Sequence, residues 1–471
     1  MKNNVRRLAY IILAGLVALC VYLGLIPFYV EHVAGDGKGP LDPRLFAREK
    51  MIQRGDILDR DGQLLAYSES VHTSEGMSPK GMVNDYVRKY PLGSAAAHIT
   101  GYYSSRYGSA GLEKSQARVL LGLDGGNPLT GLLDRVLNRP GIGNDVTLTV
   151  DADLQQYIYQ SLRGRTGAVV VFEPTTGAVL AMVASPSYEP EDVSKYIDQA
   201  GAPMLNRATQ GAYPPGSVFK IVTAAGVLTS QSFPNILEQK INCTGSLEVN
   251  GFELRDNAVH GEVDFHQAFA RSCNVAFASY GLTQGAQVFY QQALALGLTK
   301  EFDFPLPVYR GNIAKPNEMT SPELASSAIG QGELLISPLQ AALLACAVAN
   351  EGLIMKPYIV SGYSTAAGGS SIFDPQGWQQ TMDPAVAALI KQEMVDVVRN
   401  GTGKSAALPG VTVAGKTGTA ENPHGKAHAW FVGFAPAEEP RVAIAVLIEN
   451  AGAGSGSAAP LARDIIHRAL D

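Results

Sequence analysis

The spacing of apolar and polar residues changes several times along the chain, and each change predicts a different element. The first apolar stretch, residues 8–30, is 23 residues long and carries no charged side chain. At 1.5 Å of rise per residue, a helix of this length can cross a bilayer. Lys2, Arg6 and Arg7 precede it. The positive-inside rule therefore predicts one spanning helix, with residues 1–7 in the cytoplasm and the rest of the chain outside.

A cleaved signal peptide is the alternative for this stretch. The apolar core of a signal peptide is usually only about 7–15 residues long. The segment from Leu25 to Val30 also offers no small-x-small cleavage site. The pattern thus favours a permanent anchor at the cell membrane.

Residues 31–145 contain short segments separated by turn residues. Asp61-Gly62 lies between the apolar pairs Ile57-Leu58 and Leu64-Leu65, and Asp-Gly in that position is a strong hairpin signal. This region offers no nucleophile with a base at a suitable spacing. We expect a mostly β domain without chemistry of its own.

From residue 146 to 471, β-rich runs alternate with helical patterns. Strands are expected at residues 146–150, 168–172, 179–183, 412–414 and 442–448. Helices are expected at residues 152–162, 217–228, 263–271, 338–349, 384–399 and 460–471. The predicted fold class is α+β: an N-terminal membrane helix, a β domain, and a domain in which helices flank a sheet.

Composition narrows the possible functions. Hydrophobic residues make up 46% of the chain and charged residues 17%, which excludes a disordered protein. The net charge of −6 and the absence of a basic run argue against a nucleic-acid partner. The chain has four cysteines, Cys20, Cys243, Cys273 and Cys346. We interpret them as small buried hydrophobic residues that form at most one internal disulfide. The sequence proposes no metal site and no cofactor.

The first candidate for chemistry is the tetrapeptide from Ser217 to Lys220, the only S-x-x-K in the chain. Residues three apart on a helix share one face. A serine hydroxyl needs a base within hydrogen-bond reach, and a lysine can serve if burial lowers its pKa. A surface lysine behind a helix cap is the alternative when this tetrapeptide is taken alone.

Two further motifs follow. Ser272-Cys273-Asn274 comes after an expected helix, so its hydroxyl could relay a proton and its amide could bind a substrate amide; a helix cap is the alternative. Lys416-Thr417-Gly418-Thr419 follows the expected strand at 412–414. A Gly-rich strand end can present N–H groups to an oxyanion, while the lysine and the threonine hydroxyls would favour a carboxylate.

The third motif also matches a phosphate-binding loop. Residues 410–417 fit the pattern G-x-x-x-x-G-K-[ST]. That loop must follow a strand and open a helix, whereas here the β-rich residues lie within it and Asn422-Pro423 follows. We therefore expect no nucleotide partner.

Together and in this order, the three motifs resemble those of the serine penicillin-recognising family. Further matches are Tyr213 to Gly216, His260-Gly261, Ile329 to Gly332 and Trp430 to Phe434. In the first region, Arg54 to Ile57 and Gly111 to Glu113 resemble the non-catalytic pedestal of the family. An anchor, a short pedestal at 31–145 and one transpeptidase domain at 146–471 is similar to the class B arrangement.

The resemblance implies a peptidoglycan D,D-transpeptidase. Ser217 would be acylated by the D-Ala-D-Ala end of a stem peptide, with Lys220 as base, Ser272 as proton relay and Asn274 holding the peptide. The terminal carboxylate would bind at Lys416, Thr417 and Thr419 of the motif that also contains Gly418, and the N–H groups of Ser217 and Thr419 would form the oxyanion hole. Implied partners are lipid-linked precursor polymer, β-lactams as covalent inhibitors, a glycan polymerase, and division or elongation proteins.

Three other functions remain open at this point. A β-lactamase of class A would need a glutamate-activated water, and no E-x-x-x-N occurs between Asn274 and Lys416. A D,D-carboxypeptidase differs only in that water accepts the acyl group. A catalytically silent β-lactam sensor or scaffold is less favoured because all three motifs are complete.

Overall fold

The computed structural model describes residues 10, 13–19, 22, 52–71, 85–104, 106–124, 142–230, 235–365, 368–423 and 425–471. The chain forms two units, residues 1–50 and 51–471. Most of the stretch expected to span a membrane, residues 8–30, lies outside the described residues. Within the described parts of the chain, no helix combines the length and the apolar character that a membrane crossing requires.

The first sheet of the second unit has six strands in the order β15-β14-β6-β1-β2-β3. The strands are β1 (Ile57–Leu58), β2 (Leu64–Val71), β3 (Asp85–Lys89), β6 (Asp145–Leu148), β14 (Val360–Ser364) and β15 (Ser370–Ile372). The hairpin expected around Asp61-Gly62 is present, and Gly62 adopts a φ of +87° in its turn. The expected boundary at residue 146 falls within β6, and β14 and β15 return to this sheet from the second region.

A buried charge cluster explains the two pedestal motifs. Glu113 has no exposed side-chain surface, and its carboxylate receives Arg54 Nη2 at 3.0 Å and Arg88 Nε at 2.6 Å. Gly55 follows Arg54 in the sequence. A Cβ on Gly55 would lie 1.9 Å from Asn144 O, so only glycine fits at this position. Residues far apart in sequence are thus fixed together next to the first sheet.

The central sheet of the second region has five antiparallel strands in the order β17-β18-β19-β7-β8. They are β7 (Gly167–Glu173), β8 (Ala178–Ser185), β17 (Ala414–Ala420), β18 (His428–Ala435) and β19 (Val442–Ile448). Along β7 every residue up to Phe172 is buried, and alternate residues pack on opposite faces. A strand that is buried on both sides must be covered by helices on both sides.

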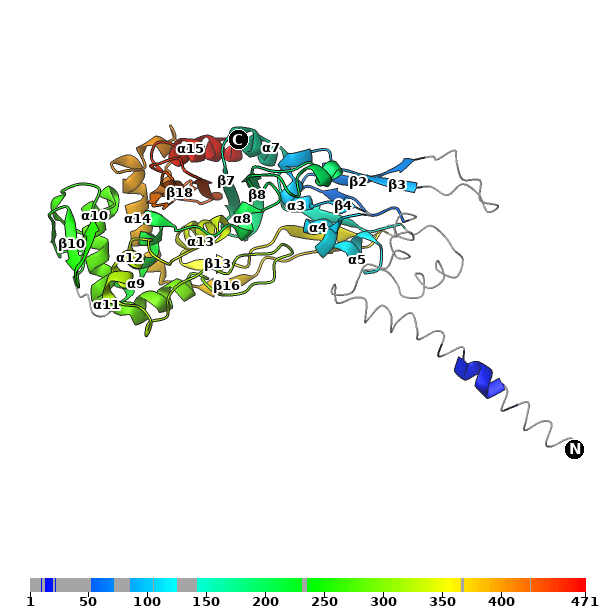
Figure 1. Ribbon diagram of the computed structural model, residues 1–471, viewed down its shortest axis with the longest axis horizontal. Helices are drawn as coiled ribbons and strands as arrows, with labels where there is room; N and C mark the ends of the chain where they lie inside the picture. Colours follow the sequence, from blue (N-terminus) through cyan, green and yellow to red (C-terminus); the bar gives the residue numbers. More distant parts are fainter. Residues whose placement is uncertain are drawn as a thin grey trace, which may run out of the picture. The chain divides into compact units, whose positions relative to one another are not determined.

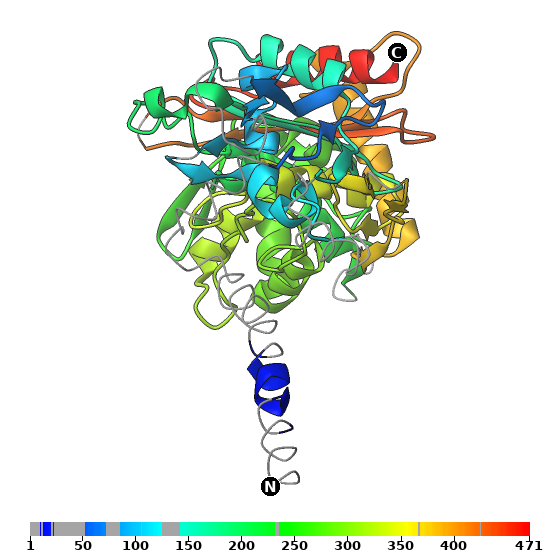
Figure 2. The same ribbon diagram turned by 90° about the vertical axis from the view of Figure 1, so that its right-hand side faces the viewer.

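Figure 1 shows these two helical layers. On one side lie α7 (Ala152–Ser161) and α15 (Ala458–Leu470); on the other lie α8 (Arg207–Gln210) and α13 (Pro338–Ala349). Figure 2 shows the same order of layers from another direction, with α15 in red above the sheet. This arrangement confirms the expected α+β domain with an antiparallel sheet between helices.

The remaining helices extend the α13 side of the domain. They are α9 (Lys220–Thr229), α10 (Phe265–Arg271), α11 (Asn274–Ala295), α12 (Ser321–Ala328) and α14 (Pro384–Arg399). Short pieces in the first region are η1 (Gly93–Ala95), α3 (Ala97–Thr100), β4 (Tyr103–Ser104), β5 (Gly108–Ser109), α4 (Gly111–Ser115) and α5 (Ala117–Leu120). Short pieces in the second region are η2 (Pro190–Lys195), η3 (Gly216–Phe219), η4 (Lys404–Ala406), β13 (Leu353–Met355) and β16 (Gly377–Gln380).

Two small sheets lie beside α10 and α11. One pairs β10 (Ser246–Val249) with β11 (Phe252–Arg255), and the other pairs β9 (Ile241–Cys243) with β12 (Gly261–Val263). The residues of these strands are mostly exposed or half-buried. Apolar burial alone therefore gives these two sheets little stability.

Candidate active site

Ser217 lies at the entrance to a buried helix. It belongs to the 3₁₀ turn η3, which continues directly into α9 at Lys220. In a 3₁₀ turn the side chains at positions i and i+3 eclipse each other, so Ser217 and Lys220 share one face. Ser217 is half-buried, whereas Lys220 has no exposed surface.

Close backbone packing fixes the position of this turn. Gly216 has a φ of +57°, and a Cβ on it would lie 2.6 Å from Thr419 O. Its N–H donates to Gly330 O at 2.8 Å, and the Trp430 indole donates to Pro214 O at 3.0 Å. The short sequences around Gly330 and Trp430 therefore support the turn that carries Ser217.

The second motif forms the junction between α10 and α11. Ser272 ends α10 in the left-handed conformation, with a φ of +60°, and Cys273 caps the start of α11. This turn directs both neighbours of Cys273 toward Lys220. Lys220 Nζ lies 2.6 Å from Ser272 O, 3.2 Å from Ser272 Oγ and 2.8 Å from Asn274 Oδ1.

The third motif lies inside a strand, which corrects one expectation. The predicted strand at 412–414 was wrong: β17 begins at Ala414 and includes Lys416 to Thr419. Pairing with β18 on one side and contact with η3 on the other overrides the low β propensity of this glycine-containing segment. The motif therefore lies along the edge strand of the central sheet.

The side chain of Lys416 contacts the second motif, and Thr417 follows it in β17. Lys416 Nζ donates to Ser272 Oγ at 2.9 Å, so this hydroxyl lies between the two lysines. Thr417 Oγ1 lies 2.6 Å from Thr402 Oγ1, whereas Thr419 is exposed at the open end of the site. Thr402, which follows α14, was missed because nothing in its local sequence indicates a site.

Gly418 contributes by lacking a side chain. A Cβ at this position would lie 3.0 Å from both Pro215 O and Val218 Cγ1. The absence of a Cβ lets η3 approach β17 closely. As a result, the turn that holds Ser217 packs against β17 next to Thr419. The oxyanion hole expected from the N–H groups of Ser217 and Thr419 stays a prediction.

Burial controls the charge of the two lysines. Removal from water lowers the pKa of Lys220 from its ordinary value to about 7, although Asp256 and Cys273 act in the opposite direction. Burial, together with the neighbouring Lys220 amine, holds the pKa of Lys416 well below its ordinary value. The site thus contains an amine that can accept a proton near neutral pH.

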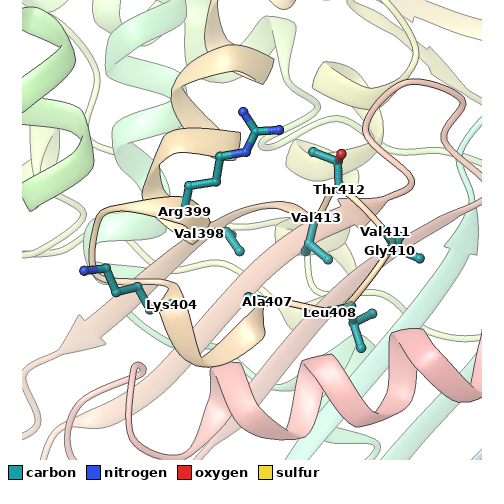
Figure 3. Close-up of a pocket in the computed structure, with 9 residues that line it drawn as sticks. All are labelled: Val398, Arg399, Lys404, Ala407, Leu408, Gly410, Val411, Thr412 and Val413. Atoms are coloured by element: carbon teal, nitrogen blue, oxygen red, sulfur yellow. The ribbon is translucent and has the colours of Figure 1, made fainter.

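The phosphate-loop interpretation fails on geometry. The pocket in Figure 3, of about 400 Å³, is lined in part by Gly410 to Val413, the first half of the pattern. The second half is strand β17 and opens no helix. A phosphate loop needs the N–H groups of a helix N-terminus around its lysine, and Lys416 instead contacts Ser272.

Comparison with known proteins agrees with this geometry. Residues 167–467 match the penicillin binding protein transpeptidase domain, and residues 54–146 match the penicillin binding protein A dimerisation domain. The peptidoglycan D,D-transpeptidase PbpA of Mycolicibacterium smegmatis is 34% identical over 512 residues, which cover 100% of this chain and 99% of that protein. PbpA of Mycobacterium tuberculosis is 33% identical over 510 residues, with the same coverage.

Solved structures show the same likeness. The ceftriaxone acyl-enzyme complex of penicillin-binding protein A from M. tuberculosis has a TM-score of 0.81 and 33% sequence identity. The match covers 90% of this chain and 99% of that one. The arrangement of motifs, the matched domains and the full-length relatives agree, and the chain belongs to the penicillin-binding protein transpeptidase family.

Proposed function

We propose that this chain is a peptidoglycan D,D-transpeptidase that works through a Ser217 acyl-enzyme. The observation that carries the proposal is the continuous set of contacts from Lys220 through Ser272 to Lys416, beside the turn that holds Ser217. A nucleophile and two buried lysine amines are thereby brought to one site from three separate parts of the chain.

Lys220 is the base. A neutral lysine amine has two N–H donors and one lone pair. The contacts at 2.6 Å to Ser272 O and 2.8 Å to Asn274 Oδ1 are to acceptors, so they use both donors. The lone pair then remains for a hydroxyl proton, and the pKa of about 7 allows the neutral form at neutral pH.

Acylation transfers one proton in each of two steps. Ser217 Oγ bonds to the carbonyl carbon of the penultimate D-Ala while its proton passes to Lys220 Nζ. The peptide C–N bond then breaks, and the leaving amine takes a proton from Ser272 Oγ, which is replenished from Lys220. The products are a Ser217 ester and free D-alanine. An amine of a neighbouring strand then attacks the ester, restores the Ser217 hydroxyl and forms the cross-link.

The other motif residues bind and polarise the substrate. Lys416, Thr417 and Thr419 bind the terminal carboxylate, and the N–H groups of Ser217 and Thr419 stabilise the oxyanion. Asn274 has an amide N–H that donates to Arg255 O at 3.1 Å, which orients the amide at the edge of the site. β-Lactams acylate Ser217 in the same way and remain attached.

The location and partners belong to the same proposal. The uncharged residues 8–30 behind three basic residues support a single-pass anchor, with residues 1–7 in the cytoplasm and residues 31–145 and 146–471 outside the membrane. A transpeptidase there acts on stem peptides of a lipid-linked precursor polymer. It therefore needs a membrane glycan polymerase nearby and works with division or elongation proteins.

Covalent labelling tests the nucleophile. The full chain is incubated with a fluorescent penicillin and separated on a denaturing gel, next to Ser217→Ala and a matched control, Ser161→Ala on α7. We expect a stable band for the wild type and the control and none for Ser217→Ala. A band that survives Ser217→Ala would contradict the proposal.

A second experiment distinguishes the acceptors. A thioester that ends in a D-alanine analogue is supplied with and without a D-amino acid, and the aminolysis and hydrolysis products are separated. A transpeptidase gives mainly the aminolysis product, whereas a D,D-carboxypeptidase gives mainly the acid. Labelling by penicillin without turnover of the thioester would indicate a silent sensor or scaffold.

A further inference from the structure

Two helices that bring side chains to the active site are also joined to each other away from it. Ser272 caps the C-terminal end of α10, and α14 leads to Thr402, whose hydroxyl contacts Thr417. Figure 1 shows α10 and α14 side by side at the same end of the domain. The position of α14 against α10 therefore determines where Thr402 lies relative to the second and third motifs.

Close to the active site, backbone atoms join the two helices. The N–H of Thr402 donates to Ala270 O at 3.3 Å. A Cβ on Gly401 would lie 2.3 Å from the same oxygen, so only glycine allows this approach. The contact fixes one point of α14 against α10, and a second contact farther along the helices would fix the angle between them.

Such a second contact exists between two side chains. His266, in the first turn of α10, contacts the Glu393 carboxylate of α14 through Nδ1. His266 lies one helical turn before Ala270, and Glu393 lies about two turns before Gly401. Residues four apart share one face of a helix. The two contacts thus hold the same faces of α10 and α14 together at two separate points.

The contact matters for Glu393 because its carboxyl is buried. The Glu393 side chain is 1% exposed, whereas that of His266 is 51% exposed. Among the described residues, His266 is the only basic side chain within 4.0 Å of this carboxylate. Burial raises the pKa of the Glu393 carboxyl, and Asp396 and Asp264 act in the same direction, whereas His266 lowers it. Without the His266 ring, α14 would carry a buried carboxyl that has no basic partner, which favours a shift of the helix toward water.

We propose that His266 and Glu393 are positioning residues, which hold α14 against α10 so that the Thr402 hydroxyl meets Thr417 in the carboxylate-binding part of the site. The inference rests on the proposed function, because carboxylate binding at Thr417 belongs to it. In the parts of the chain that the structure describes, no hydrogen bond joins either positioning residue to any of the three motifs. Their effect on the substrate therefore passes through Thr402.

Two other roles of this pair make different predictions. An ion pair that only stabilises the fold would change the free energy of unfolding and leave the kinetics of the folded protein unchanged. A pair that acts through α10 on Ser272 would lower kcat, because Ser272 relays the proton. Positioning of Thr402 instead changes KM for a substrate with a terminal carboxylate.

Three variants of the full chain separate these roles. His266→Ala removes the contact, and His266→Gln restores a hydrogen-bond donor for the Glu393 carboxylate. His467→Ala is the matched control, because His467 pairs with Asp471 at 3.5 Å at the end of α15 and both side chains are exposed. Denaturant unfolding is measured for each variant, so that a change in overall stability is known.

Amide hydrogen exchange tests the positioning role without using the activity. Peptides of the native protein that contain residues 400–403 are compared by mass spectrometry with peptides from β19. In His266→Ala we expect roughly fivefold faster exchange in the first set, as for loss of a contact of about 1 kcal/mol, and no change in the second. His266→Gln and His467→Ala should exchange as the wild type does. Unchanged exchange at residues 400–403, or an equal rise in both sets, would overturn the proposal.

A double-variant cycle tests the route through Thr402. The substrate is a thioester that ends in a D-alanine analogue and so carries a terminal carboxylate. His266→Ala should raise KM by up to roughly fivefold, the change expected for loss of one hydrogen bond, and leave kcat nearly unchanged. In a Thr402→Val background it should cause no further rise, because the contact that it supports is already lost.

The opposing outcomes are distinct. An unchanged KM in His266→Ala, or KM factors that multiply in the double variant, would overturn the route through Thr402. A lower kcat with an unchanged KM would overturn it in favour of Ser272. A wild-type protein that does not turn over the thioester would contradict the proposed function, and hydrogen exchange would still decide whether His266 and Glu393 position Thr402.

Discussion

Ionisable side chains are buried in two parts of this molecule, and their hydrogen-bonding partners differ between the two. Next to the pedestal sheet, the buried Glu113 carboxylate is held by Arg54 and Arg88. In the active site, Lys220 and Lys416 are equally buried. Among the described residues, neither lysine lies within 4.0 Å of a carboxylate oxygen, and their contacts are with hydroxyl, amide and carbonyl oxygens.

The difference lies in what compensates for lost hydration. In the pedestal, opposite charges lie 2.6–3.0 Å apart, so the cluster fixes a conformation. Neutral oxygens compensate only partly for an ammonium group, so the pKa of each lysine falls. A buried charge with a counter-ion is structural, whereas a buried amine without one becomes available for proton transfer.

The largest effect expected is on Lys220. Lys220→Arg keeps a cation but removes the base, because a guanidinium stays protonated at all accessible pH values. We expect the penicillin acylation rate to fall by about 10²–10⁴-fold. Stopped-flow or gel kinetics measure it, and Lys240→Arg, an exposed lysine, is the control.

Because an arginine can crowd this site, Lys220→Met, which has a similar length and no charge, is measured as well. A thermal unfolding measurement on both variants is the control that checks whether they are folded. An acylation rate near that of the wild type in either folded variant would rule out Lys220 as the base.

The cluster of Glu113, Arg54 and Arg88, here called the pedestal cluster, is expected to affect the stability of the fold and not the rate of acylation. Glu113→Gln leaves two buried guanidinium groups without a full counter-charge, and we expect the free energy of unfolding to fall by about 3–5 kcal/mol. Denaturant unfolding measures it. Glu191→Gln, which removes a partly exposed ion pair with Lys89, should leave the unfolding midpoint nearly unchanged.

The same Glu113→Gln protein sharpens the comparison. The fraction that remains folded should be acylated at the wild-type rate. A reduced acylation rate in the folded protein would mean that the pedestal cluster affects the active site, and it would contradict a purely structural role for this cluster.

A smaller effect is expected at Thr402. Thr402→Val keeps the shape and removes the hydroxyl that contacts Thr417 Oγ1, while Thr402→Ser keeps the hydroxyl. Loss of one hydrogen bond of about 1 kcal/mol corresponds to roughly a fivefold rise in KM for a substrate with a terminal carboxylate. Steady-state kinetics measure it, and equal KM values for the two variants would exclude a role for this hydroxyl.

The sequence predicted best those elements that carry their own end signals. The helix expected at 338–349 agrees with α13 at both ends, because Ser337 caps it and Pro338 occupies its first position. The strand expected at 442–448 also agrees with β19, since an unbroken apolar run indicates a strand buried on both faces. Such signals lie within a few residues of the element that they define.

Features that depend on distant partners were not predictable. β17 was placed too early because its pairing with β18 is what makes residues around Gly418 extended. Thr402 joins the site only because α14 ends beside β17. Cys243 and Cys273 are buried in the apolar core as expected, but their thiols also donate to Asp256, which no local pattern around either cysteine indicates.

The most direct test of the central claim is the pH dependence of acylation at saturating penicillin. Burial lowers the pKa of Lys220, whereas Asp256 and Cys273 act in the opposite direction, and burial outweighs them to leave this pKa at about 7. Because the neutral amine is the active form, the rate should rise with pH, reach half its maximum near pH 7, and level off above it. A rate that does not change between pH 5 and 9, or that rises only near the ordinary lysine pKa of about 10.4, would contradict a neutral Lys220 as the base.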